Sequence, residues 1–211
     1  MKVCIFENHP KINYLLNFLA HIYLSDSNDL ITIGNFMADS IRGNRYLDYD
    51  GEIQKGIILH RAIDTFTDAH PIYRKSKHRL HDKYGHYSGV IMDIVYDHYL
   101  AKNWNQYSDI PLEVYAADFY QLLQNRHDLL TEKIQKMLPY MIARNWLVSY
   151  SSLEGLEMIL FQMDYKTKNR VHMQEAIVEV KEYYEEFETE FTLFFEELRL
   201  HCKEILFKLS L

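Results

Sequence analysis

The sequence is poor in the residues that mark tight turns and in those that form disulfides. It has seven glycines and four prolines in 211 residues, which disfavours a turn-rich β-sandwich or barrel. The two cysteines, Cys4 and Cys202, lie at opposite ends of the chain and form neither a disulfide framework nor a closely spaced zinc pair. A reducing cytoplasm is therefore the expected location.

Long apolar runs are also absent. The most apolar early segment, residues 12–24, spans only 13 residues and contains Asn13, Asn17 and His21. No small-residue cleavage signal follows it, and a membrane helix needs about 20 apolar residues. We therefore expect neither a signal peptide nor a membrane span.

Charge is unevenly distributed along the chain. The formal net charge is −7, and residues 171–211 hold ten glutamates against four Lys or Arg. The remainder is nearly balanced, with 19 basic and 20 acidic residues, which argues against a nucleic-acid surface covering the protein. One local basic stretch, residues 74–83, is expected to be a solvated helix face.

The composition, 48% hydrophobic, favours one compact all-α domain, a multi-helix bundle over residues 12–211 preceded by a polar N-terminal tail, residues 1–11. Apolar residues at helical spacing predict its helices. These are expected at 12–24, 29–42 (closed by Gly43), 52–68, Pro71 to before Gly85, 90–103, 111–123, 131–146 with a kink or break at Pro139, and 170–208. Ser151 to Glu154 is a possible capping box. The amphipathic last helix should pack against the bundle, with a coiled-coil partner as the alternative.

Two helices carry ligand-type residues at four-residue intervals. His60, Asp64 and Asp68 lie one turn apart along one helix face. Asp93 and Asp97 repeat that spacing inside an apolar run, which a merely solvated surface does not require. Two such helices facing each other suggest a metal centre.

His21 and Asp39 each interrupt an otherwise apolar helix. Taken singly, His21 fits a buried hydrogen bond and Asp39 an ion pair with Arg42. Four such segments together favour a metal, because buried charge without a partner is costly. The predicted ligands are His21, Asp39, His60, Asp64, Asp93 and Asp97. This nitrogen and oxygen set suits Mn(II), Fe(II), Mg(II) or Zn(II), and the absence of a thiolate weakens the case for structural zinc.

Four further residues are candidates for catalysis. Arg42 and Arg61 adjoin ligand segments and could bind phosphate, or could equally balance the charge of the aspartates. Asp68 belongs to the site or instead caps its helix or meets Arg74. His98 lies about 100° around the helix from Asp97 and is either close to the site or structural. A metal and an arginine together point to phosphoester hydrolysis. No Glu-x-x-His pair, phosphate loop or nucleophile elbow is present.

Four segments, taken in order, resemble the acyl carrier protein phosphodiesterase family: residues 17–21 (NFLAH), 34–43 (GNFMADSIRG), 56–68 (GIILHRAIDTFTD) and 93–98 (DIVYDH). The resemblance is strong to about Trp104, half of the chain. It implies a helical fold distantly similar to HD-domain phosphohydrolases, release of 4′-phosphopantetheine from holo-acyl carrier protein, and Mn(II) as the expected metal. Asp97 and His98 stand in the reverse of the HD order, so HD ligand roles are not transferred position by position.

Two other functions stay open at this point. One is a metal-dependent hydrolase of a nucleotide or another small phosphoester; the other is a non-enzymatic helical binding protein with buried His and Asp networks. An acidic carrier protein would also be repelled by a net charge of −7. We therefore expect it to dock on a local basic face, with the acidic C-terminal helix facing away. That face would comprise Arg42, Arg45, Lys55, Arg61 and residues 74–83.

Overall fold

The computed structural model describes residues 18–166 and 168–211, which form helices and connecting segments without a β-strand. Its α-helices are α1 (Leu19–Tyr23), α2 (Asp29–Met37), α3 (Gly51–Ala69), α4 (Pro71–Tyr84), α5 (Tyr87–Lys102), α6 (Leu112–Asn125), α7 (Glu132–Ala143), α8 (Trp146–Ser149), α9 (Leu153–Lys166), α10 (Ile177–Glu182) and α11 (Tyr184–Ser210). Short 3-10 helices join several of them, among them η1 (Ala38–Ser40), η2 (Gly43–Asp48) and η5 (Met173–Ala176). The predicted all-α, single-domain bundle is confirmed.

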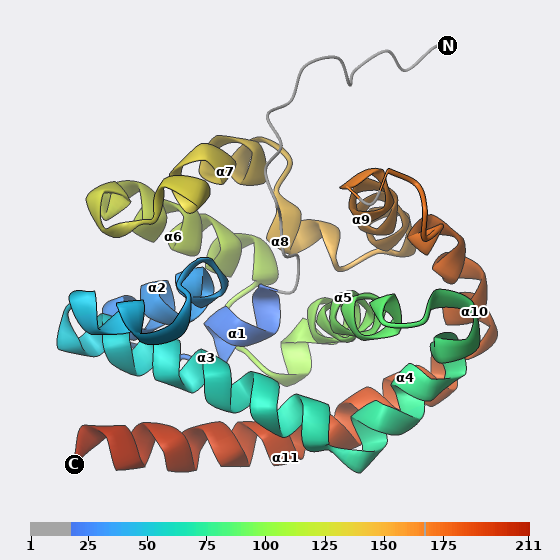
Figure 1. Cartoon of the computed structure of the whole chain (residues 1–211), viewed down its shortest axis with the longest axis horizontal. Helices are drawn as coiled ribbons and strands as arrows, with labels where there is room; N and C mark the ends of the chain where they lie inside the picture. The colour runs from blue at the N-terminus through green and yellow to red at the C-terminus, as the bar shows by residue number, and fades with distance from the viewer. Residues whose placement is uncertain (1–17, 167) are drawn as a thin grey trace.

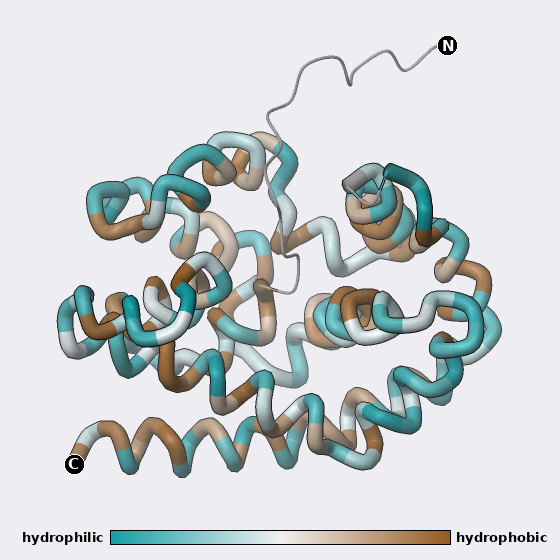
Figure 2. Tube along the Cα trace, viewed as in Figure 1, coloured by the Kyte–Doolittle hydropathy of each residue, from teal (hydrophilic) through white to brown (hydrophobic). Residues whose placement is uncertain are grey.

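The long helices α3 and α11 run along one side of the bundle, and α6 and α7 lie on the other (Figure 1). The short helix α1 lies between them, beside α5. Hydrophobic and hydrophilic residues alternate along α11 (Figure 2), and its buried face supplies Phe187, Phe191, Phe194 and Phe195 to the core. The expectation that the last helix packs against the bundle is therefore confirmed.

Two glycines allow α2 and α3 to touch backbone to backbone. A Cβ atom on Gly34 would lie 2.2 Å from the carbonyl oxygen of Ile53, and one on Gly56 would lie 2.1 Å from that of Ile31. Both distances are far shorter than van der Waals contact, so any larger residue would force the helices apart. This close approach places His60, one turn beyond Gly56, against α2.

Several predicted helix boundaries are wrong. The helix expected at 29–42 ends at Met37. Gly43, with φ +57°, does not close that helix and is instead the first residue of η2. The helix expected at 131–146 ends at Ala143 although Pro139 lies inside it. The long C-terminal helix begins only at Tyr184, after η5 and α10.

The capping residue of α9 also differs from the prediction. The hydroxyl of Ser152, rather than that of Ser151, accepts a hydrogen bond at 3.1 Å from the backbone N–H of Gly155. The predicted tail 1–11 and the start of the helix expected at 12–24 lie outside the described residues, as does Cys4. None of the helices in the described ranges combines the length and apolarity that a membrane span needs.

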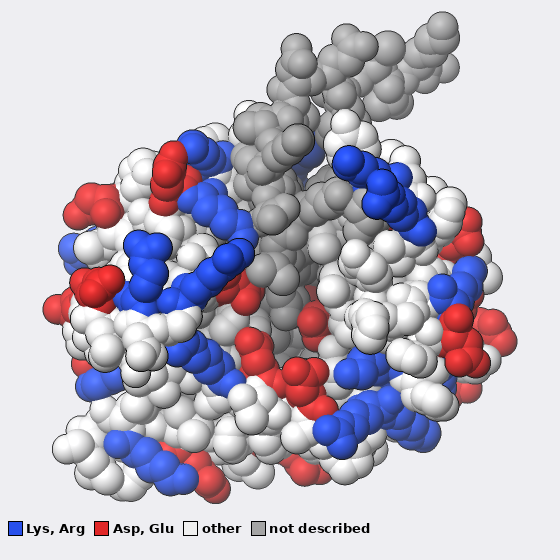
Figure 3. Space-filling view, in the orientation of Figure 1, with Lys and Arg blue, Asp and Glu red and all other residues white. Residues whose placement is uncertain are grey.

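The acidic C-terminal region faces the basic helix α4 and does not point away from it. The guanidinium of Arg79 donates to both carboxylate oxygens of Glu190, at 2.6 and 2.7 Å. Lys75 lies 3.0 Å from the same carboxylate, and Lys83 donates to Glu179 at 2.9 Å. The expectation that the acidic C-terminal helix faces away is therefore wrong, and most of the positive charge of residues 74–83 is already paired. On the face seen in Figure 3, acidic side chains gather near the centre with basic ones on either side.

Candidate metal centre

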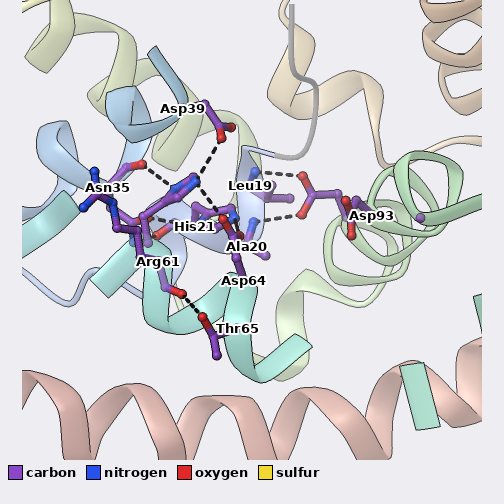
Figure 4. Close-up of polar contacts among 12 residues, drawn as sticks. Leu19, Ala20, His21, Asn35, Asp39, Arg61, Asp64, Thr65 and Asp93 are labelled. Atoms are coloured by element: carbon purple, nitrogen blue, oxygen red, sulfur yellow. Dashed lines mark hydrogen bonds and ion pairs between the residues drawn. The ribbon is translucent and has the colours of Figure 1, made fainter. Parts of the chain in front are cut away.

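Three ligand-type side chains from α1 and α3 converge. One potential ligand atom from each of His21, His60 and Asp64 lies within 4.8 Å of the other two. Asp64 spans the two histidines, with its oxygens 3.5 Å from Nε2 of His21 and 3.3 Å from Nε2 of His60. Asp39 of η1 reaches the same point, 3.3 Å from Nε2 of His60 (Figure 4). Both histidines are buried, whereas the Asp64 side chain is 49% exposed, so the centre opens to solvent on the aspartate side.

Asn35 on α2 holds both imidazole rings. Its side-chain oxygen accepts from Nδ1 of His21 at 2.9 Å, and its backbone oxygen accepts from Nδ1 of His60 at 2.9 Å. Its amide nitrogen donates to the carbonyl of His21 and to the hydroxyl of Ser25. Because carbonyl oxygens only accept, each Nδ1 carries a hydrogen. The lone pair of a neutral ring is then on Nε2, on the side of the aspartates.

The pKa values of the two histidines at the centre are shifted in opposite directions. Burial, reinforced by His60, lowers the pKa of His21 to about 4. Burial also disfavours the charged form of His60, but Asp39 and Asp64 outweigh it and raise the pKa of His60 to about 10. His60 in turn holds the pKa of Asp39 below its usual range, against the effect of burial. The group therefore has an excess of carboxylates that a cation compensates.

The donor set fits a divalent metal ion. Nε2 of His60 is buried and makes no hydrogen bond of good geometry among the described residues, although two carboxylate oxygens lie 3.3 Å away. Two imidazole nitrogens and one or two carboxylates are ligands that Mn(II), Fe(II) and Zn(II) accept. Asn35 supplies the hydrogen bonds to Nδ1 that fix the rings of metal-binding histidines. His21, His60 and Asp64 could hold such an ion, with Asp39 beside them.

The two aspartates of α5 make other contacts. Both oxygens of Asp97 accept hydrogen bonds at 2.9 Å from the backbone N–H groups of Leu19 and Ala20, at the start of α1 (Figure 4). Asp93 accepts from the hydroxyl of Tyr73 at 2.6 Å. Burial raises the pKa of each carboxyl to about 7. Neither belongs to the group formed by His21, His60 and Asp64, and Asp97 instead anchors the helix that carries His21.

The structure does not bring His98 to this centre. Its Nδ1 donates to the carbonyl oxygen of Tyr150 at 2.7 Å, and its Nε2 lies 2.8 Å from the hydroxyl of Tyr184. Burial lowers its pKa. These contacts join α5 to the segment before α9 and to α11. His98 therefore has the structural role that the sequence left open as one of its two alternatives.

The two arginines expected at the site do not line its cavity. Arg61 donates to the carbonyl oxygen of Gly43 at 2.7 Å and lies 4.8 Å from the centroid of the Tyr46 ring. Arg42 is exposed, and Asp39 pairs with His60 rather than with it. Both arginines therefore stabilise or flank the η2 segment.

A cavity of about 360 Å³ opens beside the centre between α3, α4, α5 and α11. Asp68 lines it with an exposed carboxylate 3.9 Å from Nζ of Lys77, while its backbone oxygen accepts from Arg74 at 2.7 Å. Tyr73 and Lys77 line it as well. Neither was among the predicted metal ligands or catalytic residues. Lys77 belongs to the basic stretch, where it was expected only on a solvated or docking face, and Tyr73 lies just before that stretch.

Fold and site together define an all-α protein with a buried histidine and aspartate centre beside a polar cavity. A family model described as "Acyl carrier protein phosphodiesterase" matches residues 16–198, well beyond the half of the chain that carries the resemblance in sequence. The chain belongs to the acyl carrier protein phosphodiesterase family and is an enzyme of that class.

Curated relatives agree with this assignment. An acyl carrier protein phosphodiesterase of Pectobacterium atrosepticum is 29% identical over 181 residues, 85% of this chain and 94% of the relative. That of Photorhabdus laumondii is 28% identical over 184 residues, 85% of this chain and 91% of its own. That of Yersinia pestis is 29% identical over 184 residues, 85% and 94% of the two chains. No solved structure matches the chain, so the expected likeness to HD-domain phosphohydrolases stays a prediction.

Proposed function

We propose that this enzyme hydrolyses the phosphodiester that joins 4′-phosphopantetheine to holo-acyl carrier protein, releasing the apo protein, with a divalent metal ion at His21, His60 and Asp64. The observation that supports it most is that the Nε2 atoms of His21 and His60 converge with the carboxylate of Asp64. Asn35 fixes the orientation of both imidazole rings. The family and the names of its curated relatives support the choice of substrate.

Each residue of the centre has a separate task in this proposal. His21, His60 and Asp64 would hold the ion, and a bound divalent ion supplies Lewis acidity toward phosphoryl oxygens. Asn35 keeps both Nε2 atoms in place through its bonds to Nδ1. Mn(II) is the metal that we propose, with Mg(II), Fe(II) and Zn(II) as alternatives.

The cavity walls divide into a polar and an apolar side. The polar side carries Asp64 and Asp68 from α3, and the apolar side is formed by α11 through Phe191, Phe194 and Leu198. The apolar side could shield part of a bound substrate, whereas the polar side opens to solvent at Asp64 and Asp68. A phosphodiester would bind on the polar side, next to the proposed ion.

Two exposed arginines at η2, the segment that follows Asp39 in the chain, are the better candidates for docking an acidic carrier protein. Arg42 and Arg45 are exposed on and next to η2, whereas Arg79, Lys75 and Lys83 are paired with glutamates. Reversing the charge of Arg42 and Arg45 should raise KM for the carrier protein at low salt and change kcat little. An unchanged KM would show that the carrier protein does not dock at Arg42 and Arg45.

Intact-mass measurement of holo-acyl carrier protein tests the reaction directly. The purified chain, with and without Mn(II), should remove the phosphopantetheine mass only when the metal is present. His60→Ala should abolish the change, while His78→Ala, at an exposed position of α4, should not. If a small phosphodiester such as bis(p-nitrophenyl) phosphate is cleaved but the carrier protein is not, the substrate is wrong and the small-phosphoester alternative holds.

The cysteine pattern also leads us to propose a cytoplasmic location, where holo-acyl carrier protein would be accessible.

A further inference from the structure

The cavity beside the metal centre is lined by many acids and one strong base. Its lining includes the carboxylates Asp39, Asp64, Asp68, Asp93 and Asp97. Among these lining residues Lys77 carries the one lysine or arginine side chain. A phosphodiester anion entering such a cavity is repelled by the carboxylates unless cations offset them. The chain itself supplies one such cation at Lys77.

Lys77 is held loosely and points over the cavity wall. Its side chain is 32% exposed, and its Nζ lies 5.6 Å from the centroid of the Tyr73 ring. The nearest carboxylate oxygen, on Asp68, is 3.9 Å away, and the Asp68 side chain is 77% exposed. A Cβ built on Gly89 would lie 3.6 Å from Cδ of Lys77, so the lysine stem runs against α5. An incoming anion can therefore replace Asp68 as its partner at little cost.

Other basic residues near the site either have partners or lie outside the cavity lining, as Arg42, Arg45 and Lys133 do. Arg79 forms a bidentate pair with Glu190, and Lys75 contacts the same carboxylate. Arg61 donates to the carbonyl of Gly43. Lys77 is thus distinguished from the rest of the basic stretch by facing the cavity instead of the C-terminal glutamates.

The start of α5 adds to the positive potential at the same place. Residues His86, Gly89 and Val90 line the cavity together with Lys77. The first position of this 16-residue helix has no side-chain cap. The N–H groups of a first turn and the helix dipole both favour a negative charge. An anion beside Lys77 would meet both features.

We propose that Lys77 is the residue that binds a non-bridging phosphate oxygen of the substrate, against the first turn of α5. The inference rests on the proposed function and assigns to Lys77 the role expected of Arg42 and Arg61. The ammonium and the metal would then bind the phosphoryl group from two sides. Removal of one donor to a developing oxyanion lowers kcat by about 100- to 1,000-fold, and we expect a loss of that order for Lys77→Met.

Inorganic phosphate is the probe that tests this assignment separately from turnover. Calorimetric titration of the Mn(II)-loaded protein should show phosphate binding that weakens about tenfold or more in Lys77→Met, with the affinity for Mn(II) unchanged. Lys77→Arg should restore much of the binding, because it keeps the charge. Lys75→Met is the matched control: it lies roughly 200° from Lys77 around α4 and its side chain is 68% exposed.

The outcomes separate this inference from the proposed function. Phosphate binding that is equal in Lys77→Met and wild type overturns the role of Lys77, even if the carrier protein is cleaved. Equal losses in Lys77→Met and Lys75→Met also overturn it, since they show a general charge effect. If the wild type cleaves no carrier protein but phosphate binding depends on Lys77 and not on Lys75, the substrate is wrong and the anion subsite stands.

Discussion

The imidazole rings of His21 and His60 stack with their centroids 4.1 Å apart and their planes 22° from parallel. The two rings come from different helices and are both held by Asn35. Two stacked rings cannot both be protonated without strong repulsion, which adds to burial in lowering the pKa of His21, whereas Asp39 and Asp64 raise the pKa of His60. A divalent ion between Nε2 atoms and aspartates would remove this conflict, because both rings then bind as neutral ligands.

Asn35 should control the affinity for metal without touching it. In Asn35→Ala the Nδ1 of His21 loses its acceptor, so His21 is free to rotate, whereas the Nδ1 of His60 keeps the backbone oxygen of residue 35. We expect the dissociation constant for Mn(II) to rise about 10- to 100-fold, measured by isothermal titration calorimetry. Thr32→Val, a buried change on the same helix that removes a bond to the Asn28 carbonyl, should leave it unchanged. Equal affinities in Asn35→Ala and wild type would contradict the positioning role.

Substitution of the proposed metal ligands should impair turnover more than substitution of a neighbouring residue that is not a ligand. His60→Ala and Asp64→Ala should abolish turnover of holo-acyl carrier protein and weaken Mn(II) binding, because each removes a ligand atom from the convergent group. Asp68→Ala should do less, since the ion pair of its carboxylate within residues 18–166 and 168–211 is a loose one with Lys77, at 3.9 Å. Near-normal turnover in either of the first two variants would refute the centre.

The contact between α2 and α3 should tolerate no side chain at Gly56. Gly56→Ala places a methyl group 2.1 Å from the Ile31 carbonyl oxygen, and we expect a loss of about 3 kcal/mol or more in the free energy of unfolding. Gly51→Ala is the matched control, because nothing lies within 4 Å of its Cβ position. It should leave stability unchanged or raise it by up to about 1 kcal/mol. Denaturant unfolding measures both, and equal stabilities would disprove the close approach.

The ion pair between Arg79 of α4 and Glu190 of α11 should make the free energy of unfolding depend on pH in the acidic range. Burial alone would raise the pKa of Glu190, but Arg79, Ser76 and Lys75 outweigh it and hold the pKa below its usual value of 4.5. The unfolded chain therefore takes up a proton first as the pH falls below about 4.5. The stabilisation by this pair is present above that pH and is lost at lower pH, as Glu190 titrates in the fold.

Glu190→Gln tests that dependence. It should lower the free energy of unfolding at pH 7 by about 2 to 3 kcal/mol and flatten its decline below pH 4.5. Glu196→Gln, whose carboxylate is 55% exposed and pairs with Arg199 three residues on, should change little. A pH profile of Glu190→Gln parallel to that of the wild type would contradict the account.

The helical class follows from apolar spacing, and the choice of His21, Asp39, His60 and Asp64 as candidates follows from their positions on apolar segments. Apolar periodicity shows which face of a helix is buried, and a His or Asp on that face must find a partner. Sequence spacing does not show which partner it finds. Asp97 meets the backbone of α1, and His98 meets Tyr150 and Tyr184, because these contacts depend on how helices far apart in the sequence pack.

Sequence spacing also fails to identify three residues that the structure places at the site: Asn35, Tyr73 and Lys77. Asn35 stands within a segment that matches the family, yet only the crossing of α2 and α3 at Gly34 and Gly56 shows that it reaches both histidines. The basic stretch of α4 looks uniform in sequence. Its division into residues paired with Glu190 and one facing the cavity follows from the position of α11.

The most direct test of the central claim is to count the histidine nitrogens bound to Mn(II) by electron spin echo envelope modulation. The wild type should show two imidazole nitrogens, and His60→Ala should show one. His98→Ala should still show two, because that histidine bonds to Tyr150 and Tyr184 instead. Bound Mn(II) without any histidine nitrogen in the wild type would contradict the proposed centre.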